Sequence, residues 1–69
     1  MSVEDYGMDN HIAYYRKQKR LSQRDLAKLL DVPQQRVSEW ENNHRAPHLE
    51  TALRIALILG CHVDDLFSL

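Results

Sequence analysis

The order of apolar and polar residues along this chain predicts helices. Apolar residues recur three or four positions apart, as on the buried face of an amphipathic helix, and no stretch alternates as a half-buried strand does. Only two glycines and two prolines are present, so the apolar stripes run long without a helix breaker. We therefore expect one all-α domain of five helices, at residues 10–19, 23–30, 34–42, 49–59 and 63–67.

Residues 1–9 lack this periodicity and contain Glu4, Asp5 and Asp9. An acidic start argues against a signal or transit peptide, because such peptides begin with basic residues or are depleted in acidic ones. We expect an acidic, flexible leader at 1–9 and one folded helical domain at 10–69.

The clearest helix start lies at Ser22. Its hydroxyl can accept from the backbone N–H of the third helical residue, Asp25, whose carboxylate can in turn accept from the backbone N–H of Ser22. Leu21 can pack on Leu26 across this cap. Pro33 suits the start of the next helix, because its missing N–H would have no partner there.

Two short helices with a tight turn between them, at 23–30 and 34–42, have the spacing of a helix-turn-helix. The small Ala27 suits a close crossing of these helices, and Val37 and Trp40 lie three residues apart on the inward side of the second. Trp40 could instead stack on bases, but its inward phase favours core packing.

The outward face of the second helix is where such a motif would contact bases. A glutamine amide pairs bidentately with adenine, at about 1–3 kcal/mol of discrimination. Glu39 has two interpretations: it accepts from a cytosine amino group, or it repels phosphates and fixes the register. We expect base contacts from Gln34, Gln35, Ser38 and Glu39.

The net charge of −1 hides an uneven distribution. Residues 16–45 carry eight basic and four acidic side chains, a net charge of +4, between segments of −3 at 1–15 and −2 at 46–69. A solvated helix surface would explain this pattern by itself, but a basic middle also suits a face that meets phosphates.

Several other classes of site are unsupported. Cys61 is the single cysteine, so no internal disulfide forms and a reducing cytoplasm fits best. His44 and His48 are separated by a loop with a proline rather than sharing one helical face, and Cys61 and His62 alone are too few ligands, so we expect no metal site. No apolar run approaches the roughly 18 residues of a membrane span, and no catalytic pattern stands out.

Across residues 12–67 the chain resembles the Cro/C1-type (XRE) helix-turn-helix family, which includes lambdoid phage repressors and Cro proteins. No single residue carries the resemblance, but the ordered spacing of the matches is specific. The matching residues are Leu21-Ser22-Gln23, Leu26-Ala27, Val32, Gln34, Val37-Ser38, Trp40-Glu41-Asn42, Pro47, Leu49-Glu50-Thr51, Ala56, Leu59-Gly60 and Asp64-Asp65-Leu66-Phe67.

The resemblance implies a five-helix, lambda-repressor-like fold and assigns roles to particular residues. Gln23 matches a phosphate-binding glutamine, and Arg16 and Glu41 match a partly buried ion pair between the first and third helices. The sequence departs from the family at Arg20 and Asp31, which like Asn43 replace a frequent glycine. Pro33 occupies the position at which the family usually has a capping Ser or Thr, and His44 occupies one at which a basic residue is common. We expect phosphate contacts from Ser22, Gln23, Arg36, Asn42, Asn43 and Arg45.

The resemblance also implies a transcriptional regulator, a repressor that binds double-stranded DNA with no cofactor, membrane or small-molecule partner. One recognition helix reads too few base pairs for a unique site, so we expect a homodimer on paired half-sites. The helix at 49–59 has more apolar side chains than one stripe can bury, and we expect the dimer interface at Leu57, Val63, Leu66 and Leu69. The alternative is an antitoxin-type interaction module that binds DNA secondarily. Such antitoxins usually carry an extra tail for their partner, and here only Ser68 and Leu69 follow the fifth helix.

Overall fold

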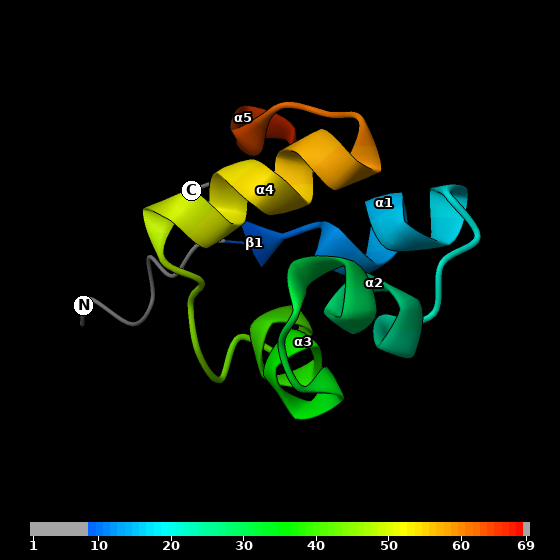
Figure 1. Cartoon of the computed structure of the whole chain (residues 1–69). Helices are drawn as coiled ribbons and strands as arrows, with labels where there is room; N and C mark the ends of the chain where they lie inside the picture. Colours follow the sequence, from blue (N-terminus) through cyan, green and yellow to red (C-terminus); the bar gives the residue numbers. More distant parts are fainter. Residues whose placement is uncertain (1–8, 69) are drawn as a thin grey trace.

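The computed structural model of the chain describes residues 9–68 and has the five expected helices (Figure 1). They pack around one core, and α3 lies at the opposite end of the molecule from α4 and α5. Residues 1–8 of the expected leader lie outside the described residues, whereas Asp9 already belongs to the fold. The helices are α1 (Ile12–Gln18), α2 (Gln23–Leu30), α3 (Gln34–Glu41), α4 (Leu49–Leu59) and α5 (Val63–Leu66).

The start of α2 has the capping box that the sequence predicts. The hydroxyl of Ser22 accepts from the backbone N–H of Asp25 at 2.9 Å, and the carboxylate of Asp25 accepts from the N–H of Ser22 at 2.9 Å. That backbone hydrogen bond holds the pKa of Asp25 below its ordinary value. The core beneath α2 draws on every helix and consists of Ile12, Leu26, Ala27, Leu30, Val37, Trp40, Ile55, Ala56, Leu59 and Leu66.

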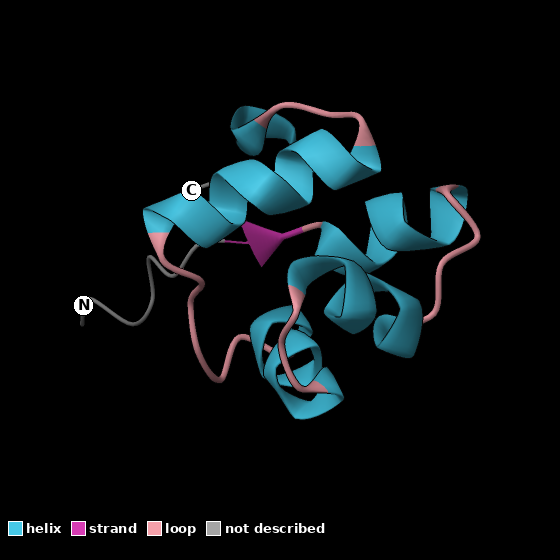
Figure 2. Ribbon diagram, in the orientation of Figure 1, coloured by secondary structure: helices cyan, strands magenta, loops and turns pink. Residues whose placement is uncertain are grey.

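A short antiparallel pairing, absent from the sequence prediction, joins the two ends of the described chain. β1 (Asp9–Asn10) pairs with β2 (Phe67–Ser68), in register Asp9 to Ser68 and Asn10 to Phe67. The backbone N–H of His11 extends the pairing to the carbonyl of Leu66 at 2.7 Å. The first helix therefore begins two residues later than predicted, and the last ends one residue earlier. Figure 2 shows β1 entering α1 beneath α4.

Three residues without glycine's freedom adopt the left-handed conformation, where the family resemblance places glycine. The φ angles are 58° at Arg20, 58° at Asp31 and 59° at Asn43. A Cβ in this conformation costs about 1–2 kcal/mol, although Asn and Asp tolerate it better than other residues. Arg20, in the turn after α1, is therefore the most strained of the three.

Replacing Arg20 with glycine is expected to raise the free energy of unfolding by about 0.5–1 kcal/mol, because the relief of strain exceeds glycine's extra entropy in the unfolded chain. Urea denaturation monitored by circular dichroism measures this change in the free energy of unfolding. The control is Arg20→Ala, which removes the same exposed charge but keeps the Cβ; equal stability of the two variants would contradict the strain argument.

The predicted dimer residues do not share one exposed surface. Leu57 on α4 is 81% exposed, but Leu66 is fully buried. The prediction is wrong for Leu66, because α5 is a single turn and this side chain closes the core. Val63 is half-buried and also packs against the core. Leu69 lies outside the described residues.

Candidate nucleic-acid interface

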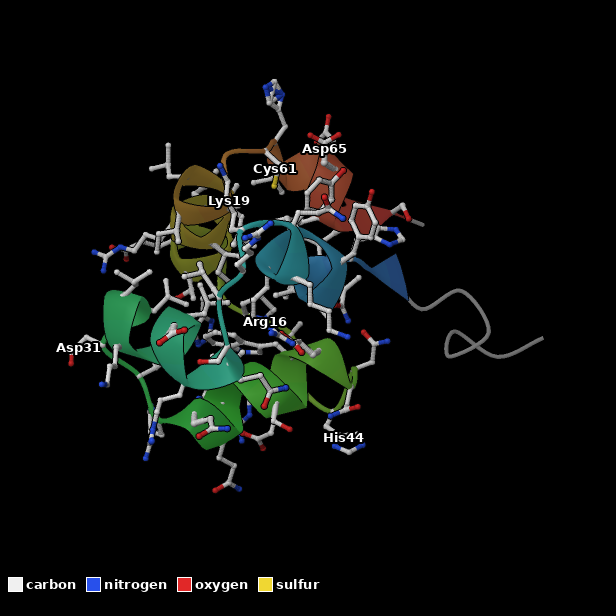
Figure 3. The ribbon with its side chains drawn as sticks, turned by 90° about the vertical axis from the view of Figure 1, so that its right-hand side faces the viewer. Arg16, Lys19, Asp31, His44, Cys61 and Asp65 are labelled. Atoms are coloured by element: carbon white, nitrogen blue, oxygen red, sulfur yellow. The ribbon has the colours of Figure 1, made fainter. Side chains whose placement is uncertain are left out.

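A tight turn sets the angle between α2 and α3. Asp31 ends α2 in the left-handed conformation, and the N–H of Val32 returns to the carbonyl of Ala27 at 3.0 Å. Pro33, with φ −65° and ψ 147°, immediately precedes the first helical residue of α3. Ala27 is buried where a larger side chain would hold the helices apart. In Figure 3, Asp31 at the end of α2 and His44 in the loop after α3 lie on either side of α3, which spans the base of the molecule.

The inward side of α3 is fixed by Val37 and Trp40, which are 0% and 5% exposed. The opposite side presents Gln34 and Gln35, both exposed, in the first turn of the helix. Ser38, also predicted to face bases, is half-buried, and it lies under the Asn42 amide, which donates to its carbonyl at 2.9 Å and its hydroxyl at 3.3 Å. The first turn of α3 therefore exposes Gln34 and Gln35 on a helix whose inward side is fixed in the core.

An ion pair between Arg16 and Glu41 ties α1 to α3. Nε of Arg16 donates to Oε2 of Glu41 at 2.7 Å and Nη2 to Oε1 at 3.1 Å, with side-chain exposures of 10% and 7%. Nη1 of Arg16 also donates to the carbonyl of Leu21 at 2.8 Å. Figure 3 shows Arg16 reaching from α1 toward α3. The ion pair that the family resemblance implies is present, its geometry is bidentate, and it fixes α3 against the first helix.

Gln23 joins this network, which the sequence did not indicate. Its Nε2 donates to Oε1 of Glu41 at 3.0 Å. One of the two amide protons is thereby engaged, and the second remains a donor at the N-terminus of α2, where the helix dipole favours an anion. Gln23 is half-buried rather than fully solvated, and its bond to Glu41 gives the amide a defined orientation.

Asn10 supports the far end of α3 and was missed from sequence. Its Nδ2 lies 2.9 Å from the carbonyl of Trp40, 3.3 Å from that of Glu41 and 2.8 Å from Oδ1 of Asn43. These carbonyls belong to the last turn of α3, where helical partners run out. The only sequence signal would be a polar side chain just ahead of an apolar stripe, which is too common to assign.

Glu39 lies between two arginines. Its Oε1 is 3.4 Å from Nε of Arg36, and its Oε2 is 3.8 Å from Nε of Arg45 in the following loop. Glu39 is 25% exposed, and the arginines are 40% and 53% exposed. Both arginines also border a hollow of about 360 Å³ between α3 and the start of α4. Arg36 and Arg45, predicted as phosphate contacts, thus turn toward the carboxylate of Glu39.

The cysteine lies away from this face. Figure 3 shows Cys61 near Lys19 and Asp65, at the end of the molecule opposite α3. Burial, with a further contribution from Asp65, raises the pKa of the Cys61 thiol, and Lys19 opposes the shift. The thiol is therefore a poorer nucleophile than a free cysteine. Among residues 9–68, no three His, Cys, Asp or Glu side chains gather as a metal site would require.

Comparison with known proteins agrees with this geometry. A family model described as helix-turn-helix matches residues 12–66, which cover all five helices. The chain belongs to this family. As a helix-turn-helix protein of the Cro/C1 (XRE) type it is a DNA-binding transcriptional regulator and not an enzyme.

This helix-turn-helix protein also has a relative in an archaeon. It is 38% identical over 60 residues to an uncharacterized HTH-type transcriptional regulator of Methanocaldococcus jannaschii, covering 87% of this chain and 91% of the relative. None of the helices in the described part of the chain is long and apolar enough to cross a membrane.

Proposed function

We propose that this helix-turn-helix protein is a cytoplasmic repressor that reads an operator by placing α3 in the major groove. The observation that carries the proposal is the exposure of Gln34 and Gln35 in the first turn of a helix whose other side is locked by Val37 and Trp40. A rigid helix with free glutamines presents paired donors and acceptors that match adenine. Ser38 and Glu39 complete the face toward the bases.

The phosphate contacts in this proposal come from both ends of the motif. Ser22 and Gln23 stand at the N-terminus of α2, where backbone N–H groups and the helix dipole favour an anion. Asn42 and Asn43 stand at the other end, at the close of α3, and are exposed. Contacts of this kind hold the protein at a fixed register without reading the sequence.

Replacing Gln35 with alanine is expected to lower discrimination at one base position per half-site by about 1–3 kcal/mol. Gln23→Ala is the matched control, since it loses a phosphate donor and is expected to weaken binding to all sequences alike. Competition among operator variants measures both. An unchanged ranking of variants with Gln35→Ala would refute base reading by this residue.

The proposal includes a homodimer. A chain of this length buries only about 60% of its unfolded surface, so association adds stability. Three leucines spaced four residues apart remain exposed on α4: Leu49 at 72%, Leu53 at 49% and Leu57 at 81%. This apolar stripe takes the place of Leu66 in the predicted interface. Large exposed apolar side chains in such number on a small protein favour an interface.

We expect sedimentation at micromolar concentration to give a dimer, and Leu57→Ser to shift it toward the monomer without loss of the folded state, because Leu57 has little contact within its own chain. A wild-type monomer in solution that also binds half-sites without cooperativity would defeat this part of the proposal.

A further inference from the structure

The ion-paired cluster of Arg36, Glu39 and Arg45, here called the Arg–Glu–Arg cluster, lies where the bases would be. Glu39 follows Gln35 by four residues, so the two side chains share one face of α3. Neither arginine is buried, and the printed nitrogen–oxygen contact of each with Glu39 is from Nε, at 3.4 Å for Arg36 and 3.8 Å for Arg45. The terminal NH₂ groups of both guanidinium forks therefore remain as donors.

A lone carboxylate on this face would be unfavourable, because it would approach a duplex lined by phosphates. Two arginines around Glu39 give the cluster a net charge of +1. The carboxylate in turn limits the rotamers of two long side chains, whose ordering otherwise opposes binding. The contacts of 3.4 and 3.8 Å are loose enough for a base edge to exchange with them.

We propose that the Arg–Glu–Arg cluster is a specificity element that selects a G·C base pair; the inference rests on the proposed function. In the major groove guanine offers the O6 and N7 acceptors that suit an arginine fork, and its partner cytosine offers the N4 donor that suits a carboxylate. Both kinds of group therefore favour the same base pair. Gln34 and Gln35 favour adenine, so a half-site combines an adenine step with a G·C pair beside it.

Selection of bound duplexes from a random pool, using the full chain, tests the inference. The wild-type protein is expected to select a G·C pair at a fixed distance from an adenine step. Glu39→Gln removes the carboxylate that accepts from cytosine N4 but leaves both arginine forks, so the preference for G·C at that position is expected to weaken toward A·T. The double variant Arg36→Lys, Arg45→Lys keeps the charge but loses both forks, and its discrimination at that position is expected to fall about 5- to 150-fold.

The matched control is Arg54→Lys. Arg54 forms an ion pair with Glu50 at 2.9 Å, with exposures of 62% and 78%. Both residues belong to α4, the helix that lies at the opposite end of the molecule from α3 (Figure 1). The Arg54→Lys variant makes the same substitution in an exposed Arg–Glu pair, and it is expected to leave the selected DNA site unchanged. Because Lys preserves charge, the salt dependence of binding is expected to be the same in all the Lys variants.

The outcomes separate the role of the cluster from the proposed function. A selected site with adenine steps but no fixed G·C pair overturns the role of the cluster and leaves base reading by the glutamines intact. The role of the cluster is equally overturned if Glu39→Gln and the double Lys variant select the wild-type site. A wild-type protein that selects no sequence overturns the proposed function and this inference with it.

Discussion

Glu41→Ala is expected to lower the free energy of unfolding by about 3–5 kcal/mol, a large part of the stability of so small a domain. The carboxylate accepts from Arg16 twice and from Gln23 once, and its side chain is only 7% exposed. Removing it leaves the guanidinium of Arg16 buried between α1 and α3 with the carbonyl of Leu21 as its remaining partner. Urea denaturation monitored by tryptophan fluorescence is suitable, because Trp40 precedes Glu41 in α3.

Glu50→Ala is the control for this experiment. Glu50 pairs with Arg54 at a similar distance, 2.9 Å, but both side chains are largely solvated. Exposed pairs contribute about 0–1 kcal/mol, so the loss is expected to be several-fold smaller than for Glu41→Ala. Equal losses in the two variants would mean that burial of the Arg16–Glu41 pair does not determine its effect.

Leu26→Ala is expected to destabilise the fold by about 2–5 kcal/mol, through lost apolar burial and the cavity left behind. Leu26 is fully buried in α2, among core residues contributed by the other helices. The same substitution at Leu29, three residues later in the same helix and 58% exposed, is the control. Its helix propensity change is identical, so the difference between the two variants isolates burial.

Chemical denaturation of both variants side by side gives that difference. We expect Leu29→Ala to change the free energy of unfolding by no more than about 0.5 kcal/mol, as for most surface substitutions. A loss at Leu29 comparable with that at Leu26 would show that Leu29 is covered in solution, for instance by a second copy of the chain.

Local chemistry made the helices and turns predictable. The cap at Ser22 and Asp25 depends on residues three apart, and the inward stripe of α2 depends on helical periodicity alone. The three left-handed positions could be expected because the family resemblance marks them, at Arg20, Asp31 and Asn43. Each of these features is decided within one or two turns of chain.

Features decided by distant residues were missed. Two-residue strands are too short to show alternation, so β1 and β2 left no pattern. α5 is a single turn, in which periodicity cannot distinguish an inward Leu66 from an outward one. The pairing of Glu39 with Arg36 follows helical spacing, but its pairing with Arg45 depends on the path of the loop after α3. The roles of the base- and phosphate-facing residues remain predictions.

The pairing of β1 with β2 has a consequence for the order of events on the ribosome. Asn10, which holds the last carbonyls of α3, sits on a strand whose partner is synthesised only after α5. Contacts among the helices at the front of the chain need only residues already made, whereas this long-range pairing must wait for Phe67 and Ser68. The brace that Asn10 gives to the last turn of α3 is therefore completed late in folding, once Phe67 and Ser68 are available to pair with β1.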